Sequence, residues 1–195
     1  MLRSKGAMKS STALWRLFAA LPCFAQSGSQ PARHRQDLRQ PTEIQGYSCA
    51  KGYAWFYADG HLDSCTITRE TVFGDAHAPE GSWIRLTPDG KPLSLGLSFD
   101  TQILGLTCEG GGALGPAEGP ATTFYPSGHL KVCWLAGDQT VQGVPCMGAG
   151  RLLNAFFRHA KSADAEFYED GRLHSCTLSK NFGGRDRSEQ FTQGP

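Results

Sequence analysis

The stretch that decides the fold occurs three times in the chain, as FYADGHLDSCTI at 56–67, FYPSGHLKVCWL at 124–135 and FYEDGRLHSCTL at 167–178. The shared pattern is F-Y-x-x-G-x-L-x-x-C-x-[LI]. Two aromatic residues favour a strand, the glycine supplies the positive φ of a tight turn, and the alternating residues after it favour a second strand. Each copy therefore predicts a β-hairpin. A degraded fourth copy, 86–97, has Leu95 in place of the cysteine.

A second element alternates with this hairpin and reads IQGYSC at 44–49, ILGLTC at 103–108 and VQGVPC at 141–146. The shared pattern is φ-x-G-φ-x-C, in which φ is an apolar residue. We expect one further strand from it, with the glycine marking a bulge or a bend, so that each unit holds roughly three short strands. A decayed copy at 72–76 places Ala76 in the cysteine position.

The second strand of each hairpin shows which face is buried. Cys133 and Leu135 share one face in the middle copy, and Trp134 lies on the other. Other copies carry Ser64 and Thr66 on that other face. The Cys-x-Leu face is therefore the expected core face. The sequence predicts an all-β protein, an antiparallel meander of stacked hairpin repeats that forms an elongated sheet.

Two inserts interrupt the repeats, because the spacing of the turn glycines is uneven. One insert lies at 109–122 and is rich in glycine. The other lies at 151–165, where a short apolar run fits a helix or an extra strand equally well. The expected repeat domain spans 43–182, followed by a disordered tail at 183–195.

Composition agrees with a turn-rich β protein and excludes some functions. Glycine accounts for 24 of 195 residues, and valine and isoleucine together for only eight. The whole chain has a net charge of +1, but residues 43–195 carry 12 basic and 17 acidic residues, a net charge of −5. A basic surface is the usual signature of nucleic-acid binding, so we expect no nucleic-acid partner.

The N-terminal segment is basic and then apolar. Residues 1–25 contain four basic residues and no acidic one, and an apolar stretch ends at Ala25. This arrangement is typical of a secretory signal peptide, and the stretch is too short to span a bilayer. We interpret 26–42, which is polar and has no period, as a flexible linker. The expected location is secreted or periplasmic.

The F-Y-x-x-G-x-L hairpin resembles the bacterial variant of the MORN repeat (membrane occupation and recognition nexus), which is often labelled an antitoxin-type repeat. The φ-Q-G-φ-x-C companion is similar to that of uncharacterised secreted bacterial repeat proteins. The resemblance covers roughly residues 43–182 and implies stacked hairpins with no catalytic residues to carry over. Lipid or partner binding, as discussed for the family, is an implication of the resemblance alone.

Six cysteines remain after the leader, and an even number in an exported chain indicates disulfides. Cys133 and Cys146 are the best local pair, because pairing them across a hairpin also places Leu135 opposite Val144. If the turn lies at 137–138 instead, that register is lost. The other four cysteines admit three pairings, and buried free thiols are the alternative. No zinc-binding spacing is present, and we expect no metal site.

No catalytic constellation is visible in the sequence. The turn acids and the histidines at 61 and 129 occupy positions that turn chemistry and exposure explain. Tyr57, Tyr125 and Tyr168 are more informative, because stacked repeats would align them into a ladder. An exposed ladder would suit a sugar or a peptide, whereas cross-strand packing would use the same rings to stabilise the sheet.

These observations favour a non-catalytic, exported β-repeat module that binds or scaffolds in the bacterial envelope or outside the cell, with no cofactor. The partner would be a protein or a glycan, and the oligomeric state stays open. An intracellular antitoxin-like protein binder is one alternative. An enzyme with a site in the inserts at 109–122 or 151–165 is the other.

Overall fold

The protein is built from β-strands throughout the part that the structure describes. The computed structural model describes residues 31–111, 121–149 and 163–194, and it contains no helix in these ranges. All described residues belong to one compact unit, Pro31–Pro195. Within these ranges no helix is long and apolar enough to cross a membrane.

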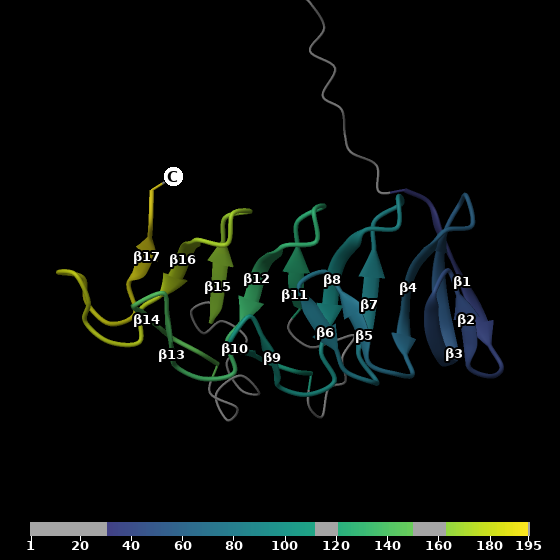
Figure 1. Ribbon diagram of the computed structural model, residues 1–195, viewed down its shortest axis with the longest axis horizontal. Helices are drawn as coiled ribbons and strands as arrows, with labels where there is room; N and C mark the ends of the chain where they lie inside the picture. Colours follow the sequence, from purple (N-terminus) through teal and green to yellow (C-terminus); the bar gives the residue numbers. More distant parts are fainter. Residues whose placement is uncertain (1–30, 112–120, 150–162, 195) are drawn as a thin grey trace, which may run out of the picture. The chain divides into compact units, whose positions relative to one another are not determined.

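The largest element is an antiparallel sheet of eleven strands. Its strands are β1 (Arg33–Leu38), β2 (Thr42–Ile44), β3 (Tyr47–Tyr57), β4 (Leu62–Ile67), β7 (Trp83–Leu86), β8 (Pro92–Gly96), β11 (Ala121–Phe124), β12 (Leu130–Trp134), β15 (Asp164–Phe167), β16 (Leu173–Thr177) and β17 (Gln190–Thr192). Apart from β2, which pairs with β3 at the side, neighbouring strands follow the order of the sequence (Figure 1). The predicted all-β antiparallel meander is confirmed.

Three two-stranded sheets complete the fold. They are β5 (Thr71–Phe73) with β6 (Ala76–Ala78), β9 (Thr101–Ile103) with β10 (Leu106–Cys108), and β13 (Gln139–Val141) with β14 (Val144–Cys146). Together with β2 and the start of β3 they are the four φ-x-G-φ-x-C elements. We call each of these four a short hairpin and each F-Y-x-x-G-x-L element a long hairpin.

One short hairpin followed by one long hairpin makes a repeat. The four are repeat 1 (42–67), repeat 2 (71–97), repeat 3 (101–135) and repeat 4 (139–178).

The glycine of the short hairpin forms a turn and not the bulge or bend that the sequence predicts. In repeat 1, Ile44 is paired with Tyr47, and the two residues between them, Gln45 and Gly46, have φ angles of +50° and +87°. Positive φ at both central residues is the requirement of a type I′ turn, which joins two strands directly. Repeats 2, 3 and 4 therefore have four strands each where the sequence predicts roughly three, and in repeat 1 the continuous strand β3 belongs to both hairpins.

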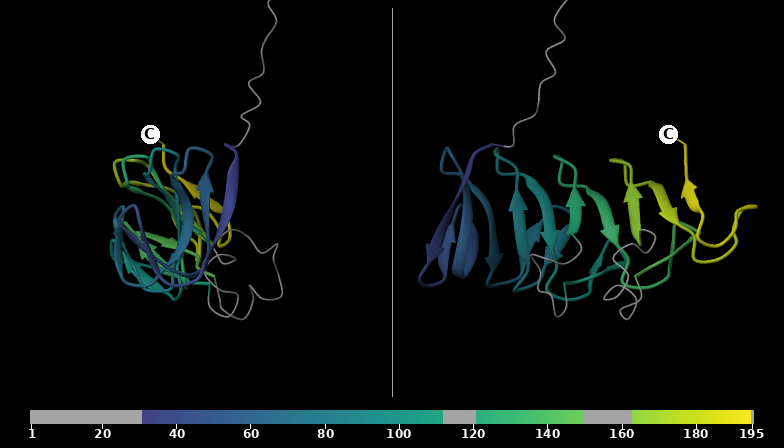
Figure 2. Two further views of the ribbon diagram at one scale, coloured as in Figure 1. Left: turned by 90° about the vertical axis from the view of Figure 1, so that its right-hand side faces the viewer. Right: turned by 180° about the vertical axis from the view of Figure 1, so that it is seen from behind.

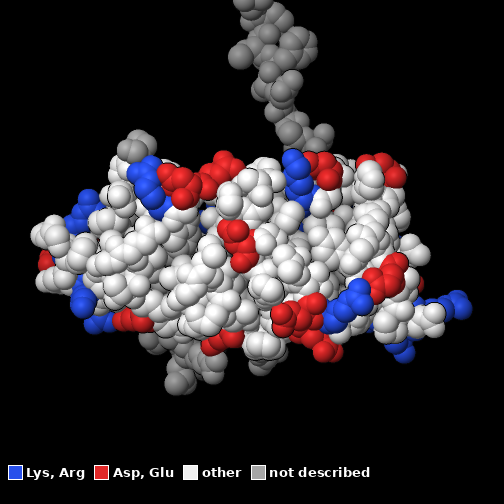
Figure 3. Space-filling view, viewed as in Figure 1, with Lys and Arg blue, Asp and Glu red and all other residues white. Residues whose placement is uncertain are grey.

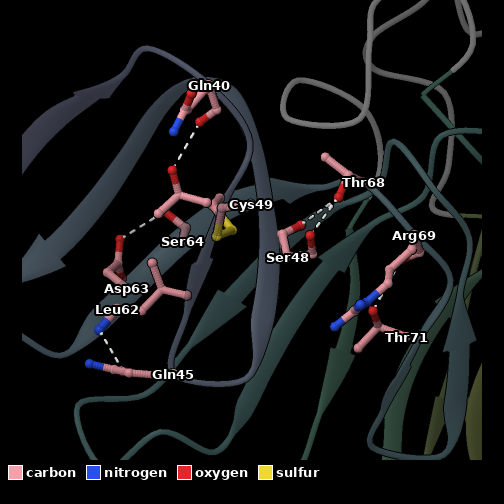
Figure 4. Close-up of a disulfide and its surroundings, with 12 residues drawn as sticks. Gln40, Gln45, Ser48, Cys49, Leu62, Asp63, Ser64, Thr68, Arg69 and Thr71 are labelled. Carbon is pink, nitrogen blue, oxygen red and sulfur yellow. Dashed lines mark hydrogen bonds between the residues drawn. A yellow bond between two sulfur atoms is a disulfide. The ribbon is translucent and has the colours of Figure 1, made fainter.

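Each disulfide joins the short hairpin and the long hairpin of one repeat. The pairs are Cys49–Cys65, Cys108–Cys133 and Cys146–Cys176, and Figure 4 shows the first of them. The predicted Cys133–Cys146 bridge is therefore wrong. It assumed that these two cysteines face each other across one hairpin, whereas the residue opposite Cys146 is Gln139.

Repeat 2 has lost both members of its cysteine pair. Ala78 lies opposite Thr71, as Cys49 lies opposite Thr42 in repeat 1, so Ala78 and not Ala76 occupies the cysteine position. On the long hairpin, Leu95 takes the other cysteine position, five residues after the turn glycine. The two replacements together therefore account for the absence of one disulfide from repeat 2.

The core lies between the long sheet and the short hairpins, and Figure 2 (left) shows the strands arranged around this interior. Cys133 and Leu135 are fully buried, which confirms the predicted core face. Phe73 of a short hairpin packs edge to face on Phe124 of a long hairpin, with ring centroids 5.5 Å apart. Residues of both layers therefore share one apolar cluster.

The sheet extends beyond the repeat domain that the sequence predicts. Strand β1 lies inside the predicted flexible linker 26–42, and β17 lies inside the predicted disordered tail 183–195. Both are polar strands at the edges of the sheet, where only one partner strand is needed, so their composition gave little sign of them. Within the two inserts, residues 112–120 and 151–162 lie outside the described ranges.

Candidate functional site

The three tyrosines of the predicted ladder connect each repeat to the next chain segment. The Tyr57 hydroxyl donates to the Leu86 carbonyl at 2.7 Å, Tyr125 to Phe167 at 2.8 Å and Tyr168 to Gln193 at 2.7 Å. Burial raises the pKa of Tyr57 to about 12. These bonds agree with the alternative that the tyrosines stabilise the sheet. That they also form a binding surface stays a prediction.

The turns of the long hairpins are held by side chains from the short hairpins. In repeat 1, Gln45 donates to the Gly60 carbonyl at 3.3 Å and accepts from the Leu62 N–H at 3.0 Å, and the second bond is drawn in Figure 4. Gln142 repeats both contacts in repeat 4, with Gly171 at 2.8 Å and Leu173 at 3.0 Å. One glutamine amide thus fastens the two layers in each of these repeats.

Repeat 2 departs from this arrangement. Its long hairpin has Pro92 where the others have leucine, and proline has no N–H to donate. The short hairpin of repeat 2 binds the turn of repeat 3 instead. The Asp75 N–H donates to the Gly128 carbonyl at 3.0 Å, and the Asp75 carboxylate accepts from the Leu130 N–H at 2.9 Å. A Cβ on Gly74 would lie 2.4 Å from the same carbonyl oxygen, so this approach requires glycine.

In repeat 3, the turn of the short hairpin forms no hydrogen bond with a long-hairpin turn among the described residues. Leu104 stands where repeats 1 and 4 have glutamine, and the turn that it would have met is bound by Asp75. Leu104 has a φ of +49° and an exposed fraction of 66%. Gln45 and Gln142 have the same left-handed conformation, with φ angles of +50° and +48°, so Leu104 differs from them by its apolar side chain and its lack of a docking contact.

A cavity of about 540 Å³ opens beside this turn. It lies between the long-hairpin turns of repeats 3 and 4, with the Leu104–Gly105 turn at its side. Apolar side chains from four strands or turns line it, and polar ones come from the turns. Its lining includes Asp75, Leu104, Leu106, His129, Leu130, Val141, Phe167, Glu169 and Asp170.

Three of the six residues with polar side chains that line the cavity are acidic. His129 Nδ1 lies 3.3 Å from the Asp75 carboxylate, and Arg172 Nε lies 2.7 Å from the Asp170 carboxylate. The Arg172 backbone N–H, which donates to Asp170 at 3.0 Å, lowers the pKa of that carboxyl. Glu169 is exposed beside Asp170. The carboxylates therefore outnumber the cationic groups at this opening.

Two further clusters lie on the long sheet, away from the cavity. Asp63 has a fully buried side chain and pairs with Arg33 at 3.2 Å and with Arg85 at 3.3 Å, which ties β1, β4 and β7 together. Arg35 lies over the Tyr53 ring at 4.6 Å, and Tyr53 contacts the Trp83 ring at 5.4 Å. Both clusters are satisfied by contacts across the sheet.

The described residues contain no group of three or more histidine, cysteine, aspartate or glutamate side chains that could hold a metal ion. Charged residues on the face shown in Figure 3 lie mainly along its upper and lower margins, often with opposite charges side by side, and the area between them is largely uncharged. The cavity beside Leu104 is therefore the feature of the described chain that best fits a binding site.

Comparisons with known proteins give no independent label for this site. A scan against protein-family models, a search of curated proteins and a search of solved structures found no match to this chain.

The sequence analysis did not single out Asp75 or Leu104. Both stand at the turn of a short hairpin, where Leu104 takes the position of Gln45 and Gln142 and Asp75 takes the position of the glycine that follows them, and these two departures are the signal that could have found them. The interpretation of the glycine as a bulge hid this signal, because it placed the preceding residue inside a strand.

Proposed function

We propose that this protein is a non-catalytic binding module that works outside the cytoplasm, and that the cavity between repeats 3 and 4 is its binding site. One observation carries the proposal: Leu104 is an exposed apolar side chain at a cavity, at the turn position where two other repeats have a docked glutamine. Exposed apolar surface rimmed by polar groups is typical of ligand sites.

Export is supported by the disulfides together with the basic and apolar leader. Three bridges in one chain are consistent with an oxidising compartment, because cytosolic thiols are kept reduced. We infer a secreted or periplasmic location, which disfavours the antitoxin-like intracellular alternative. Fractionation of the producing cells tests this inference. We expect an oxidised chain without residues 1–25 outside the cytoplasm, and a reduced, full-length cytosolic chain would contradict it.

The resemblance to bacterial MORN-like repeats fits a role in scaffolding. The repeats then act as a frame that fixes the cavity, and the partner is a protein or a glycan. The enzyme alternative depended on the inserts, whose central parts lie outside the described residues, so it gains no support here.

The binding site is tested by a ligand-observed NMR screen of the oxidised full chain with small amines, carboxylates, sugars and neutral apolar compounds. Leu104→Gln gives the turn the residue of repeats 1 and 4, so we expect it to fold normally and to lose the ligands. Val72→Gln is the matched control, because Val72 is also 66% exposed on a short hairpin but does not line the cavity. Ligands that bind all three proteins equally would place the site elsewhere.

A further inference from the structure

The cavity has an apolar wall and an acidic opening, and this combination selects a class of ligand. We propose that it takes an alkyl cation, the side chain of an arginine or a lysine in a peptide partner. The apolar stem would lie along the wall and the charged head would reach the carboxylates. This inference rests on the proposed function, since it names the ligand of the same site.

The apolar wall is formed by residues from two short hairpins and two long hairpins. Leu104 and Leu106 come from the short hairpin of repeat 3, Val141 from that of repeat 4, and Leu130 and Phe167 from two long hairpins. Leu130, Val141 and Phe167 are buried within the core, so this wall is fixed. Arginine and lysine side chains cover apolar surface with their methylene groups while the head stays hydrated.

The acidic opening provides the charge complement for the head. Asp75 stands on the side of repeat 3, and Glu169 and Asp170 stand on the side of repeat 4. Glu169 is particular to repeat 4, since Ala58, Pro88 and Pro126 occupy its position in the other long hairpins. Glu169 therefore does not belong to the repeated motif, and it makes the opening of this cavity more acidic than the motif alone would.

The hydrogen bonds that the lining residues already form also favour a cationic ligand. The Gln142 amide uses one of its two N–H groups in the bond to Gly171 and its oxygen in the bond from Leu173, so at most one N–H is left for a ligand. The carboxylates, in contrast, have oxygen lone pairs in excess of these contacts, because each carboxylate has about four acceptor positions. The cavity therefore offers acceptors to a ligand and suits a donor-rich cation.

A matched pair of probes tests the charge directly. Nα-acetyl-arginine amide and Nα-acetyl-citrulline amide have nearly the same shape, and only the first is a cation. In titrations of the ¹⁵N-labelled, oxidised full chain we expect both to shift the amide signals around Leu104. The arginine probe should bind about tenfold more tightly, since a charge-assisted hydrogen bond is roughly twice as strong as a neutral one. Nα-acetyl-lysine amide then distinguishes the two basic side chains.

Two variants locate the charge that matters. Glu169→Gln should reduce the preference for arginine over citrulline several-fold, and Asp59→Asn, in the turn of repeat 1 far from the cavity, should leave it unchanged. Equal binding of the two probes, or an unchanged preference in Glu169→Gln, would overturn the cation assignment. Binding of other compounds in the screen that depends on Leu104 would then still support the site itself. Absence of any arginine shift at millimolar concentration would also refute the assignment.

Discussion

Repeat 2 and repeat 4 have the same strand order but are held together differently. In repeat 4 a disulfide, a glutamine amide and a tyrosine hydroxyl fasten the short hairpin, the long hairpin and the following strand. Repeat 2 has Ala78 and Leu95 at the cysteine positions, Thr87 at the tyrosine position and Pro92 where an N–H would be bound. Repeat 2 therefore has none of the three interactions that stabilise repeat 4, because the residues that form them are replaced.

The comparison shows how a repeat protein acquires a unique site. The short hairpin of repeat 2 has neither the disulfide nor the glutamine contact to its own long hairpin, and its Asp75 binds the turn of repeat 3. The turn at Leu104 is then left undocked, and the cavity lies beside it. A change of sequence in one repeat thus creates a site at the next junction, while the long sheet remains continuous.

The largest expected effect comes from removing a fastening of repeat 4. Cys146→Ala with Cys176→Ala should lower the free energy of unfolding by about 3–4 kcal/mol, because the bridge closes a loop across a sequence separation of 30. Urea unfolding of the oxidised protein measures the loss, and hydrogen exchange shows where it acts. We expect faster exchange in β13 to β16 and little change in repeat 1.

If the free energy of unfolding falls by less than about 1 kcal/mol, the disulfide does not distinguish repeat 4 from repeat 2 in stability. Thiol titration is the control, since the Cys49–Cys65 and Cys108–Cys133 bridges must be intact for the comparison to hold.

A smaller effect is expected where the displaced hairpin of repeat 2 is anchored. Asp75→Ala should cost about 2 kcal/mol, since it leaves the Leu130 N–H without its charged acceptor. Asp75→Asn keeps an acceptor oxygen at this position and should cost clearly less. Thermal unfolding of both variants measures the difference, and equal losses would show that the hydrogen bond does not hold the hairpin.

The smallest effect concerns the tyrosine hydroxyls. Tyr125→Phe leaves the Phe167 carbonyl without its donor and should cost about 1 kcal/mol. Thr87→Tyr gives repeat 2 the residue that the other repeats have and should gain a similar amount. Urea unfolding of each variant checks the pair. If Thr87→Tyr destabilises the protein, the turn of repeat 2 has diverged too far to accept the contact.

Much of the fold could be predicted from the sequence because it depends on short-range chemistry. The hairpin turns follow from Asp-Gly and Ser-Gly pairs, and the buried face follows from alternation around Cys133. Pairing of the cysteines depends on which strands lie across the core, which no local pattern states, and that is why Cys133–Cys146 was the wrong choice. Edge strands such as β1 escape notice because a polar strand with one partner has no apolar period.

The candidate site was harder to predict, since it depends on contacts between repeats. Asp75 and Leu130 are 55 residues apart, and no local pattern states that the short hairpin of repeat 2 contacts the turn of repeat 3. Pro92 was the available clue, because it removes an N–H that Leu62 and Leu173 use in the other repeats.

The three bridges join cysteines that are consecutive in the chain: 49 with 65, 108 with 133, and 146 with 176. None of the loops that they close overlaps another. A polypeptide that emerges N-terminus first into an oxidising compartment can therefore seal each loop before the next pair of cysteines has appeared. Oxidation in order of emergence gives the native connectivity, and no later exchange between bridges is needed.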